Sequence, residues 1–165
     1  MNGRTVRESR VTLTQLMGVT DANPLGNVHG GIIMKLCDEA GGMAGMRYAR
    51  RPVVTVSVDS MTFHSAVNIG NLLTVQAEVT WTGHTSLETR MVVTAEDVLT
   101  GQRTHTNSAY FAYVALDEEG NPTPVPPLIC ETDSEKRLFE EAAARRERRL
   151  QRRNLDLQNP TRSST

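Results

Sequence analysis

The feature of this sequence that most limits its possible folds is one long helical segment that holds five glycines. Apolar residues recur there with the 3.6-residue period of a helix, between residues 28 and 49, at Ile32, Ile33, Leu36, Cys37, Ala40, Met43, Ala44 and Tyr48. The glycines in the same segment are Gly30, Gly31, Gly41, Gly42 and Gly45. Each interior glycine costs a helix about 0.5–1 kcal/mol relative to alanine. A close approach of the helix to a β-sheet would explain most of them, and Asn27 is a candidate N-terminal cap.

The rest of the chain up to residue 128 has the pattern of β-strands. A short alternating strand is expected at residues 11–16, and four longer strands are expected after the helix, at residues 53–58, 72–82, 87–95 and 102–116. The segments between the later strands, at 68–71, 83–86 and 95–102, are rich in turn-forming residues. A run of strands with one segregated helix predicts an α+β fold with an antiparallel sheet.

A second helix is expected near the C-terminus. The sequence Thr132-Asp133-Ser134-Glu135 has the form of a capping box, which would begin a helix that continues to about Arg153. Its apolar stripe is thin and consists of Leu138, Phe139, Ala142 and Leu150. We therefore expect a domain at residues 1–128, a charged helix at 129–153 and a disordered tail at 154–165.

The balance of charge argues against a generally basic nucleic-acid-binding protein. The chain has 18 Lys and Arg residues against 19 Asp and Glu residues, a net charge of −1. Residues 145–153 nevertheless hold six arginines and one glutamate. We favour a solvated helix, or one that pairs with an acidic neighbour, because no aromatic residues alternate with the arginines. Contact with nucleic-acid phosphates is the alternative.

Several features favour a cytoplasmic protein. Cys37 and Cys130 form no CxxC pair and suit a reducing compartment. The N-terminal residues lack the apolar core of a signal peptide, and no segment approaches the roughly 20 apolar residues that a membrane span needs. The absence of GxSxG, P-loop, GxGxxG and HExxH motifs leaves an α/β-hydrolase serine, a phosphate-binding loop and a zinc site without support.

The segment between Asn23 and Gly42 is the most informative for chemistry. A helix N-terminus at Gly30 and Gly31 offers unpaired backbone N–H groups at a positive dipole end, which can stabilise an oxyanion. Asp38 and Glu39 follow within an apolar stretch, where a carboxylate is costly unless it is paired or functional. For Glu39 a solvated or paired role is favoured, with Lys35 or Arg47 as its partner. For Asp38 the structural and functional interpretations are equally supported.

The spacing of these groups indicates that one chain alone does not complete a site. Gly30 and Asp38 are eight residues apart, which is about 12 Å along a helix at 1.5 Å per residue. They cannot both contact one carbonyl group from the same helix. If both serve one site, two chains must contribute to it, and a two-fold axis would create two equivalent sites per dimer.

Residues 21–42, DANPLGNVHGGIIMKLCDEAGG, closely resemble the signature of the hotdog-fold acyl-CoA thioesterases of the cytosolic acyl-CoA hydrolase type. The similarity extends over roughly residues 10–128. Residues 51–71 resemble the family's second strand and the turn after it, and residues 111–128 resemble its final strand and exit. The resemblance implies the hotdog fold, in which an antiparallel sheet wraps around one long helix and two such units pair edge to edge.

The resemblance also implies the site residues. The paired Asn and Asp of the family, contributed across the dimer interface, fall on Asn23 and Asp38. The backbone N–H that binds the thioester carbonyl falls on Gly30, with Gly31 as a second candidate. By the same analogy the coenzyme A groove is lined by Val58, Asp59, Gly83, His84, Thr85 and Ser86. His84 stands where an arginine is common, and a neutral histidine attracts phosphate less strongly.

The implied reaction is hydrolysis of an acyl-CoA to a fatty acid and coenzyme A. Asp38 would act as general base or as nucleophile, Asn23 would orient water or Asp38, and His29 would have a capping or loop role. No metal or organic cofactor is expected. The expected partner is a second copy of the chain, in a homodimer and further in a trimer of dimers. The alternatives are an acyl-CoA sensor or a dehydratase of the same fold, and nucleic-acid binding through the Arg-rich helix. A narrower alternative is that this helix steers anionic coenzyme A or contacts a membrane surface.

Overall fold

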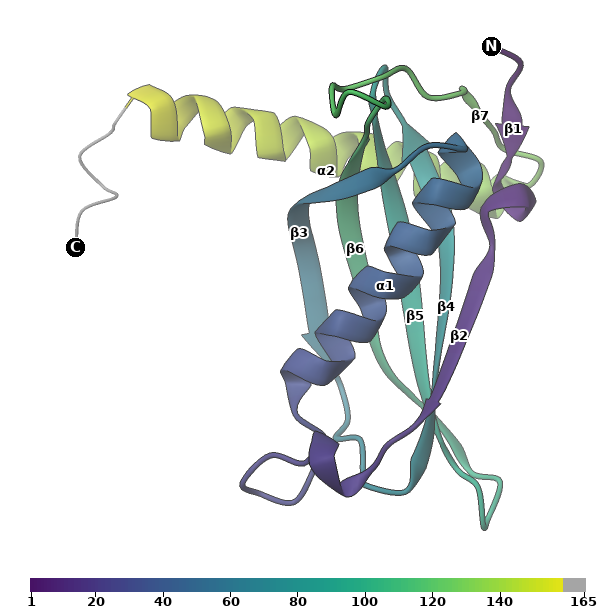
Figure 1. Ribbon diagram of the computed structural model, residues 1–165, viewed down its shortest axis with the longest axis vertical. Helices are drawn as coiled ribbons and strands as arrows, with labels where there is room; N and C mark the ends of the chain where they lie inside the picture. Colours follow the sequence, from purple (N-terminus) through teal and green to yellow (C-terminus); the bar gives the residue numbers. More distant parts are fainter. Residues whose placement is uncertain (159–165) are drawn as a thin grey trace.

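The computed structural model describes residues 1–158, and the order of its main elements is the expected one (Figure 1). The elements are β1 (Arg4–Thr5), a 3-10 turn (Val6–Ser9), β2 (Val11–Leu16), a second 3-10 turn (Val19–Asp21), α1 (Gly30–Ala49), β3 (Val53–Phe63), β4 (Asn71–Thr82), β5 (Ser86–Asp97), β6 (Arg103–Ala115), β7 (Leu128–Ile129) and α2 (Asp133–Gln158). Strands β1 and β7 form a small parallel pair that the sequence did not predict. No helix within residues 1–158 is both long and apolar enough to cross a membrane.

The main sheet has five strands in the order β2-β4-β5-β6-β3, and every neighbouring pair is antiparallel. Helix α1 lies across one face of this sheet (Figure 1). The core forms between the buried side of α1, which includes Ile33, Leu36 and Ala40, and inward residues of the central strands such as Val75 and Met91. The predicted α+β fold with an antiparallel sheet around one long helix is confirmed.

Two of the five glycines in α1 are required by the close contact between helix and sheet. A Cβ atom on Gly41 would lie 2.5 Å from the Tyr113 hydroxyl oxygen and 2.7 Å from Thr89 Oγ1. A Cβ atom on Gly45 would lie 3.2 Å from Leu87. Gly31 and Gly42 have no such neighbour across the interface closer than 3.8 Å. The expected close approach is therefore confirmed at Gly41 and Gly45, which lie against the sheet.

Edge strand β3 contains two irregularities that decide which way its side chains point. Its register with β6 shifts between Thr55 and Ser57 and again between Val58 and Ser60, so that Val56 and Asp59 are extra residues. Such bulges break the simple alternation of a strand and re-aim side chains. As a result Thr55 and Val58 both lie on the α1 side of the sheet, and Asp59 lies on the opposite side.

Helix α2 lies on the face of the sheet opposite to α1, crosses it behind β4–β6 and extends beyond β3 (Figure 1). The predicted capping box is present: Glu135 N donates to Thr132 Oγ1 (3.2 Å), and Thr132 N donates to Glu135 Oε2 (3.1 Å). Ala142 is fully buried, and Phe139 packs against Trp81. The helix continues to Gln158, five residues beyond the expected end at Arg153, and residues 159–165 of the expected tail lie outside the described part of the chain.

Candidate functional site

Asp38 is a half-buried carboxylate on the exposed side of the middle of α1, held by two hydroxyl groups from the sheet. Thr55 Oγ1 of β3 donates to Asp38 Oδ1 over 2.6 Å, and the Tyr113 hydroxyl of β6 lies 3.3 Å from the same oxygen. Burial and the negative charge of Asp38 raise the pKa of Tyr113, so this phenol keeps its proton at neutral pH. Both hydroxyls can therefore donate to the carboxylate and fix its orientation.

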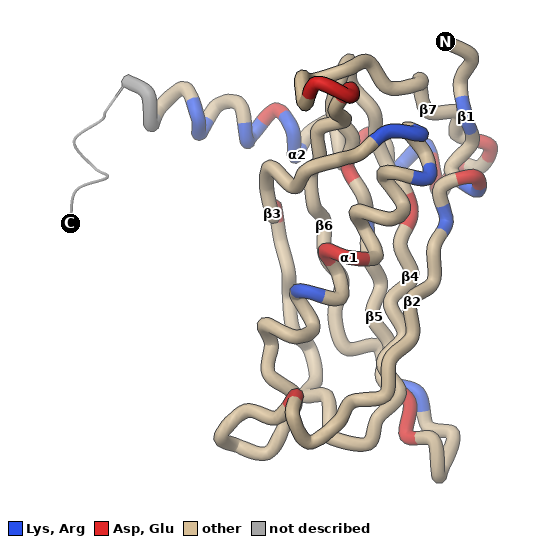
Figure 2. Tube along the Cα trace, viewed as in Figure 1, with Lys and Arg blue, Asp and Glu red and all other residues tan. Residues whose placement is uncertain are grey.

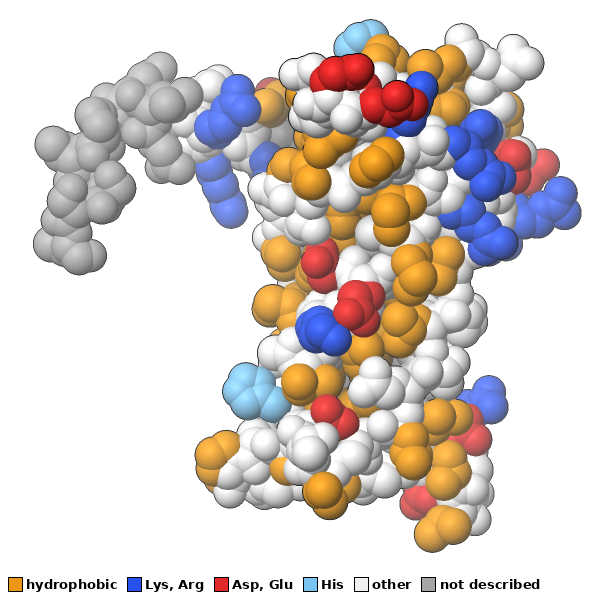
Figure 3. All heavy atoms as spheres, in the orientation of Figure 1, with side chains coloured by type: hydrophobic (Ala, Val, Ile, Leu, Met, Phe, Trp, Pro, Cys, Tyr) orange, Lys and Arg blue, Asp and Glu red, His pale blue; other side chains and the backbone are white. Residues whose placement is uncertain are grey.

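The Asp38 carboxylate faces an apolar groove between α1 and β3. The groove is lined by Gly31, Met34, Lys35, Asp38, Thr55, Val58 and Phe111. Further apolar side chains are exposed on the same two elements, among them Met43, Met46, Val54, Val56 and Phe63. Hydrophobic side chains gather on this face of the molecule, over α1 and β3 (Figure 3). An apolar substrate chain or a partner subunit could cover this surface, since exposed apolar patches commonly mark such contacts.

The loop before α1 fixes Asn23 through its side-chain carbonyl. Asn23 Oδ1 accepts hydrogen bonds from Leu25 N (2.9 Å) and Asn27 N (3.2 Å), and the two backbones are joined by the bond from Asn23 N to Asn27 O (2.7 Å). The Asn23 Nδ2 group makes no hydrogen bond with any described residue, so it is the end of the side chain that is available to donate to a carboxylate, water or ligand.

The cap of α1 is His29 and not Asn27. His29 Nδ1 accepts a hydrogen bond from Gly31 N over 2.9 Å, which confirms the capping role expected for His29 and corrects the assignment of the cap to Asn27. The Gly31 N–H is therefore already used. The Gly30 N–H, at the first position of the helix, has no acceptor among residues 1–158 and remains the better candidate for a carbonyl oxygen.

The structure places the predicted catalytic residues in two separate depressions of one chain. Asn23 and Gly30 line a depression that also contains Ile33, Phe63 and His64. Asp38 lines the groove with Gly31 and Val58. A single chain therefore brings neither Asn23 nor Gly30 together with Asp38. The separation of Gly30 from Asp38 agrees with the spacing argument, and a site shared by two chains stays a prediction.

The residues predicted to bind coenzyme A also lie at different places. The turn Gly83–Ser86 lies at the end of the sheet where β3 begins, because Ser86 is paired with Val114 and Val114 with Val54. Gly30 lies at the other end, beside Phe63, the last residue of β3. Val58 lines the Asp38 groove, but Asp59 faces α2 on the opposite side of the sheet, where it pairs with Arg149.

Other charged groups near these positions have structural partners. Lys35 Nζ lies 3.0 Å from Glu39 Oε1, which confirms the paired role favoured for Glu39.

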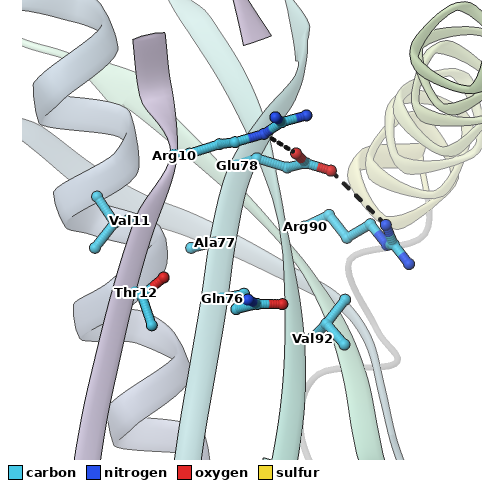
Figure 4. Close-up of a pocket in the computed structure, with 8 residues that line it drawn as sticks. All are labelled: Arg10, Val11, Thr12, Gln76, Ala77, Glu78, Arg90 and Val92. Carbon is cyan, nitrogen blue, oxygen red and sulfur yellow. Dashed lines mark hydrogen bonds and ion pairs between the residues drawn. The ribbon is translucent and has the colours of Figure 1, made fainter. Parts of the chain in front are cut away.

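A further hollow on the outer face of β2, β4 and β5 holds none of the predicted residues (Figure 4). Its central carboxylate, Glu78, lies between Arg10 (3.0 Å) and Arg90 (3.7 Å). Within the described residues, no group of three or more His, Cys, Asp or Glu side chains could hold a metal ion.

Thr55 and Tyr113 are the site residues that were not predicted. Thr55 lies in the run VVTVSV, where β-branched residues indicate a strand and nothing more. Tyr113 lies in a strand rich in aromatic and small residues. The glycine at position 41 was the available signal for Tyr113, since its missing side chain is what gives the phenol room beside α1.

Comparison with known proteins gives one consistent family. Residues 25–102 match the model of the thioesterase superfamily. The chain is 40% identical over 143 residues to the cytosolic acyl coenzyme A thioester hydrolase of Rattus norvegicus; the match covers 86% of this chain and 38% of the rat protein. The chain thus spans about two fifths of the length of that relative.

Two solved structures match over nearly the full length of both chains. A hexameric acyl-CoA thioesterase is 39% identical, with a TM-score of 0.88 over 92% of this chain and 97% of the other. An acyl-CoA hydrolase from Staphylococcus aureus, solved with butyryl coenzyme A, coenzyme A and coenzyme A disulfide, is 30% identical, with a TM-score of 0.88 over 98% and 99%. Together with the sheet wrapped around α1, these matches show that the chain belongs to the thioesterase superfamily, among its hotdog-fold acyl-CoA thioester hydrolases.

Proposed function

We propose that this protein hydrolyses acyl-CoA thioesters to a carboxylic acid and free coenzyme A, at sites shared between two chains. The observation that carries the proposal is the Asp38 carboxylate, which faces an apolar groove and is held by Thr55 Oγ1 at 2.6 Å. A carboxylate fixed in an apolar setting has its lone pairs directed at whatever occupies the groove, as a base or a nucleophile requires.

Variants of the Staphylococcus aureus relative support the choice of residues. That enzyme has been solved with an Asp, an Asn or a Thr replaced by Ala, and the Asn is fifteen positions before the Asp and the Thr seventeen positions after it. In this chain Asn23, Asp38 and Thr55 have the same separations. The three residues picked out by the present geometry therefore match, in type and spacing, those altered in the relative.

The proposed site forms when two α1 helices lie antiparallel across a two-fold axis. One chain then supplies Asn23 and Gly30, and the partner supplies Asp38 and Thr55. The apolar residues exposed on α1 and β3 support this arrangement, because pairing would remove them from water. The hexameric relative supports a further assembly into a trimer of dimers. As the rat relative is a cytosolic protein by name, we expect this chain to act in the cytosol.

The chemistry follows from these positions. The Gly30 N–H, at the positive end of α1, donates to the thioester carbonyl and stabilises the oxyanion. The Asp38 carboxylate removes a proton from water, or attacks the carbonyl carbon itself and is then released by water. Asn23 Nδ2 donates to the attacking water or to Asp38. Both routes break the C–S bond, and the coenzyme A thiolate is a good leaving group that takes up the proton. Neither route needs a group beyond the protein's own side chains and backbone.

The test is free-thiol release from acyl-CoAs of increasing chain length. We expect turnover by the unaltered protein and a loss of at least about a hundredfold in Asp38→Asn and Asn23→Ala, in the range of a lost catalytic base. Glu39→Gln is the matched control, because Glu39 is the neighbouring carboxylate and is paired with Lys35. Binding of acyl-CoA without thiol release by the unaltered protein would contradict hydrolysis and indicate a sensor.

A further inference from the structure

A cavity on the α2 side of the sheet has no role in the proposed reaction. It is lined by Asp59, Ser60, Arg145, Arg148, Arg149 and Arg152. The four arginines recur at intervals of three and four residues and therefore share one face of α2. Basic residues follow α2 as it passes beyond β3 (Figure 2). The cavity thus combines a concave shape with a strong excess of positive charge.

Two of the four arginines have structural partners in the body of the protein. Arg145 holds the fully buried Glu88 through two hydrogen bonds of 2.8 and 3.0 Å and stacks over the Tyr110 ring. Arg149 pairs with Asp59 and lies 3.7 Å from Glu88. These contacts anchor α2 to the sheet and fix the position of the cavity wall. They also use Asp59 and Glu88, the two carboxylates of the sheet that contact these arginines.

The other two arginines have no ion-pair partner among the side chains that the structure describes. Arg148 and Arg152 are exposed, and neither forms an ion pair with any of residues 1–155. They are one helical turn apart, and like charges at this spacing destabilise a helix. Burial also lowers the pKa of Arg149, because a guanidinium that loses hydration is harder to keep charged. An anion in the cavity would remove both penalties.

We propose that this cavity binds phosphate groups, held by Arg148 and Arg152 with the Ser60 hydroxyl and Arg149 at its wall. Guanidinium groups bind phosphate oxygens in pairs of parallel hydrogen bonds, and the hydroxyl of a serine adds a neutral donor. The phosphates can come from two sources: the coenzyme A part of the substrate, in which case this inference rests on the proposed function, or a separate phosphate compound.

Strand β3 connects the arginine cavity with the Asp38 groove, which favours the substrate as the source of the phosphates. Val58 lines the Asp38 groove and Asp59 lines the arginine cavity, so consecutive residues of one strand belong to the two sites. The phosphates of coenzyme A are separated from the thioester by a long flexible arm. The site that holds them is therefore expected at a distance from Asp38.

The binding test uses inorganic diphosphate and adenosine 3′,5′-bisphosphate, which is the nucleotide end of coenzyme A without its thiol arm. We expect calorimetric titration of the full chain to show binding that weakens as salt is raised. The double variant Arg148→Gln/Arg152→Gln should bind at least about tenfold more weakly. The control Arg7→Gln/Arg137→Gln removes the same charge from exposed arginines outside the cavity and should bind as the unaltered protein does.

Steady-state kinetics then separate the two sources. If coenzyme A supplies the phosphates, the double variant raises KM for acyl-CoA and leaves kcat unchanged. If KM is also unchanged while diphosphate binding is lost, the ligand is a separate phosphate compound. The proposal is overturned if neither probe binds the unaltered protein, if the control loses as much affinity as the double variant, or if only duplex DNA binds. Failure of thiol release alone would contradict the proposed reaction and would leave the diphosphate titration unaffected.

Discussion

The Asp38 carboxylate depends on hydroxyl groups from two neighbouring strands, and Thr55 makes the shorter contact. The bulge after Thr55 allows both this residue and Val58 to face α1, although they are three positions apart. A sequence pattern with strict alternation cannot show such an arrangement. Asp38 stood out because a carboxylate in an apolar helix is unusual, and the family resemblance then assigned it to the site, whereas Thr55 has the residue type that any strand would have.

Replacing Thr55 tests its positioning role. Thr55→Val keeps the shape of the side chain and removes the donor to Asp38 Oδ1. Because a hydrogen bond to a charged group contributes about 1.5–3 kcal/mol, we expect kcat/KM for acyl-CoA to fall roughly 10- to 100-fold. Thr55→Ser should restore most of the activity. A purely structural role would instead give equal losses in both variants, together with a lower unfolding midpoint.

Cys37 lies next to Asp38 but is expected to be chemically inert. Burial raises the pKa of the Cys37 thiol to about 12, and the Asp38 charge contributes in the same direction. The reactive thiolate is therefore scarce at neutral pH and becomes abundant only above that pKa. In a Cys130→Ser variant, where Cys37 is the one remaining cysteine, a disulfide reagent should label no thiol in the native protein and one per chain after unfolding. Rapid labelling of the native variant at neutral pH would contradict this.

At some glycines of α1 the sheet leaves no room for a Cβ atom, and at others it does. This difference should be measurable in the stability of Gly→Ala variants. In Gly41→Ala the added Cβ atom would meet Tyr113 Oη at 2.5 Å, Thr89 Oγ1 at 2.7 Å and Met91 Sδ at 2.9 Å. We expect overpacking to lower the free energy of unfolding by about 1–3 kcal/mol. Gly42→Ala is the matched control, since its Cβ atom has its nearest neighbour at 3.8 Å and should raise the free energy of unfolding by up to about 1 kcal/mol. Equal effects in urea denaturation would show that the glycines serve another purpose.

The elements themselves were well determined by periodicity, and the failures have physical causes. Strands β4, β5 and β6 alternate over part of their length because one face packs on α1, and their positions were predicted within a few residues. Strand β3 was expected to end at Val58 but continues to Phe63. Residues 59–63 have no strand pattern of their own, and they are held in the strand because they pair with β6. The cap of α1 was misplaced because His29 is an uncommon capping residue, whereas Asn27 is of a preferred type.

At the scale of the whole molecule, the division of the site between chains can be tested by mixing two inactive variants. If Asn23 of one chain serves Asp38 of the other, a dimer of one Asn23→Ala chain and one Asp38→Ala chain has one intact site and one doubly altered site. Random re-assembly of an equal mixture should then recover about one quarter of the original thiol-release activity. A site within one chain would be defective in every combination, so an inactive mixture would contradict the shared site.

The separation of Gly30 from Asp38 within one chain could be predicted from the sequence, whereas the sharing of the site between chains stays a prediction. The argument needed only the spacing of eight positions and the rise of a helix, and the structure places the two residues in different depressions of one chain. The position of Asp59 could not be foreseen, because it depends on the second bulge of β3 and on where α2 crosses the sheet.

The strand order has a consequence for how the chain reaches this fold during synthesis. Strands β4, β5 and β6 follow one another both along the chain and in the sheet, whereas β2 pairs with β4 and β3 with β6 across long stretches of sequence. The parts made first are therefore the last to find their partners, since contacts between distant segments form slowly. Helix α1, weakened by its glycines, has no surface to pack on until the β4–β6 meander exists. We expect the N-terminal third of a nascent chain to remain unstructured, and open to proteases, until roughly residue 115 has left the ribosome.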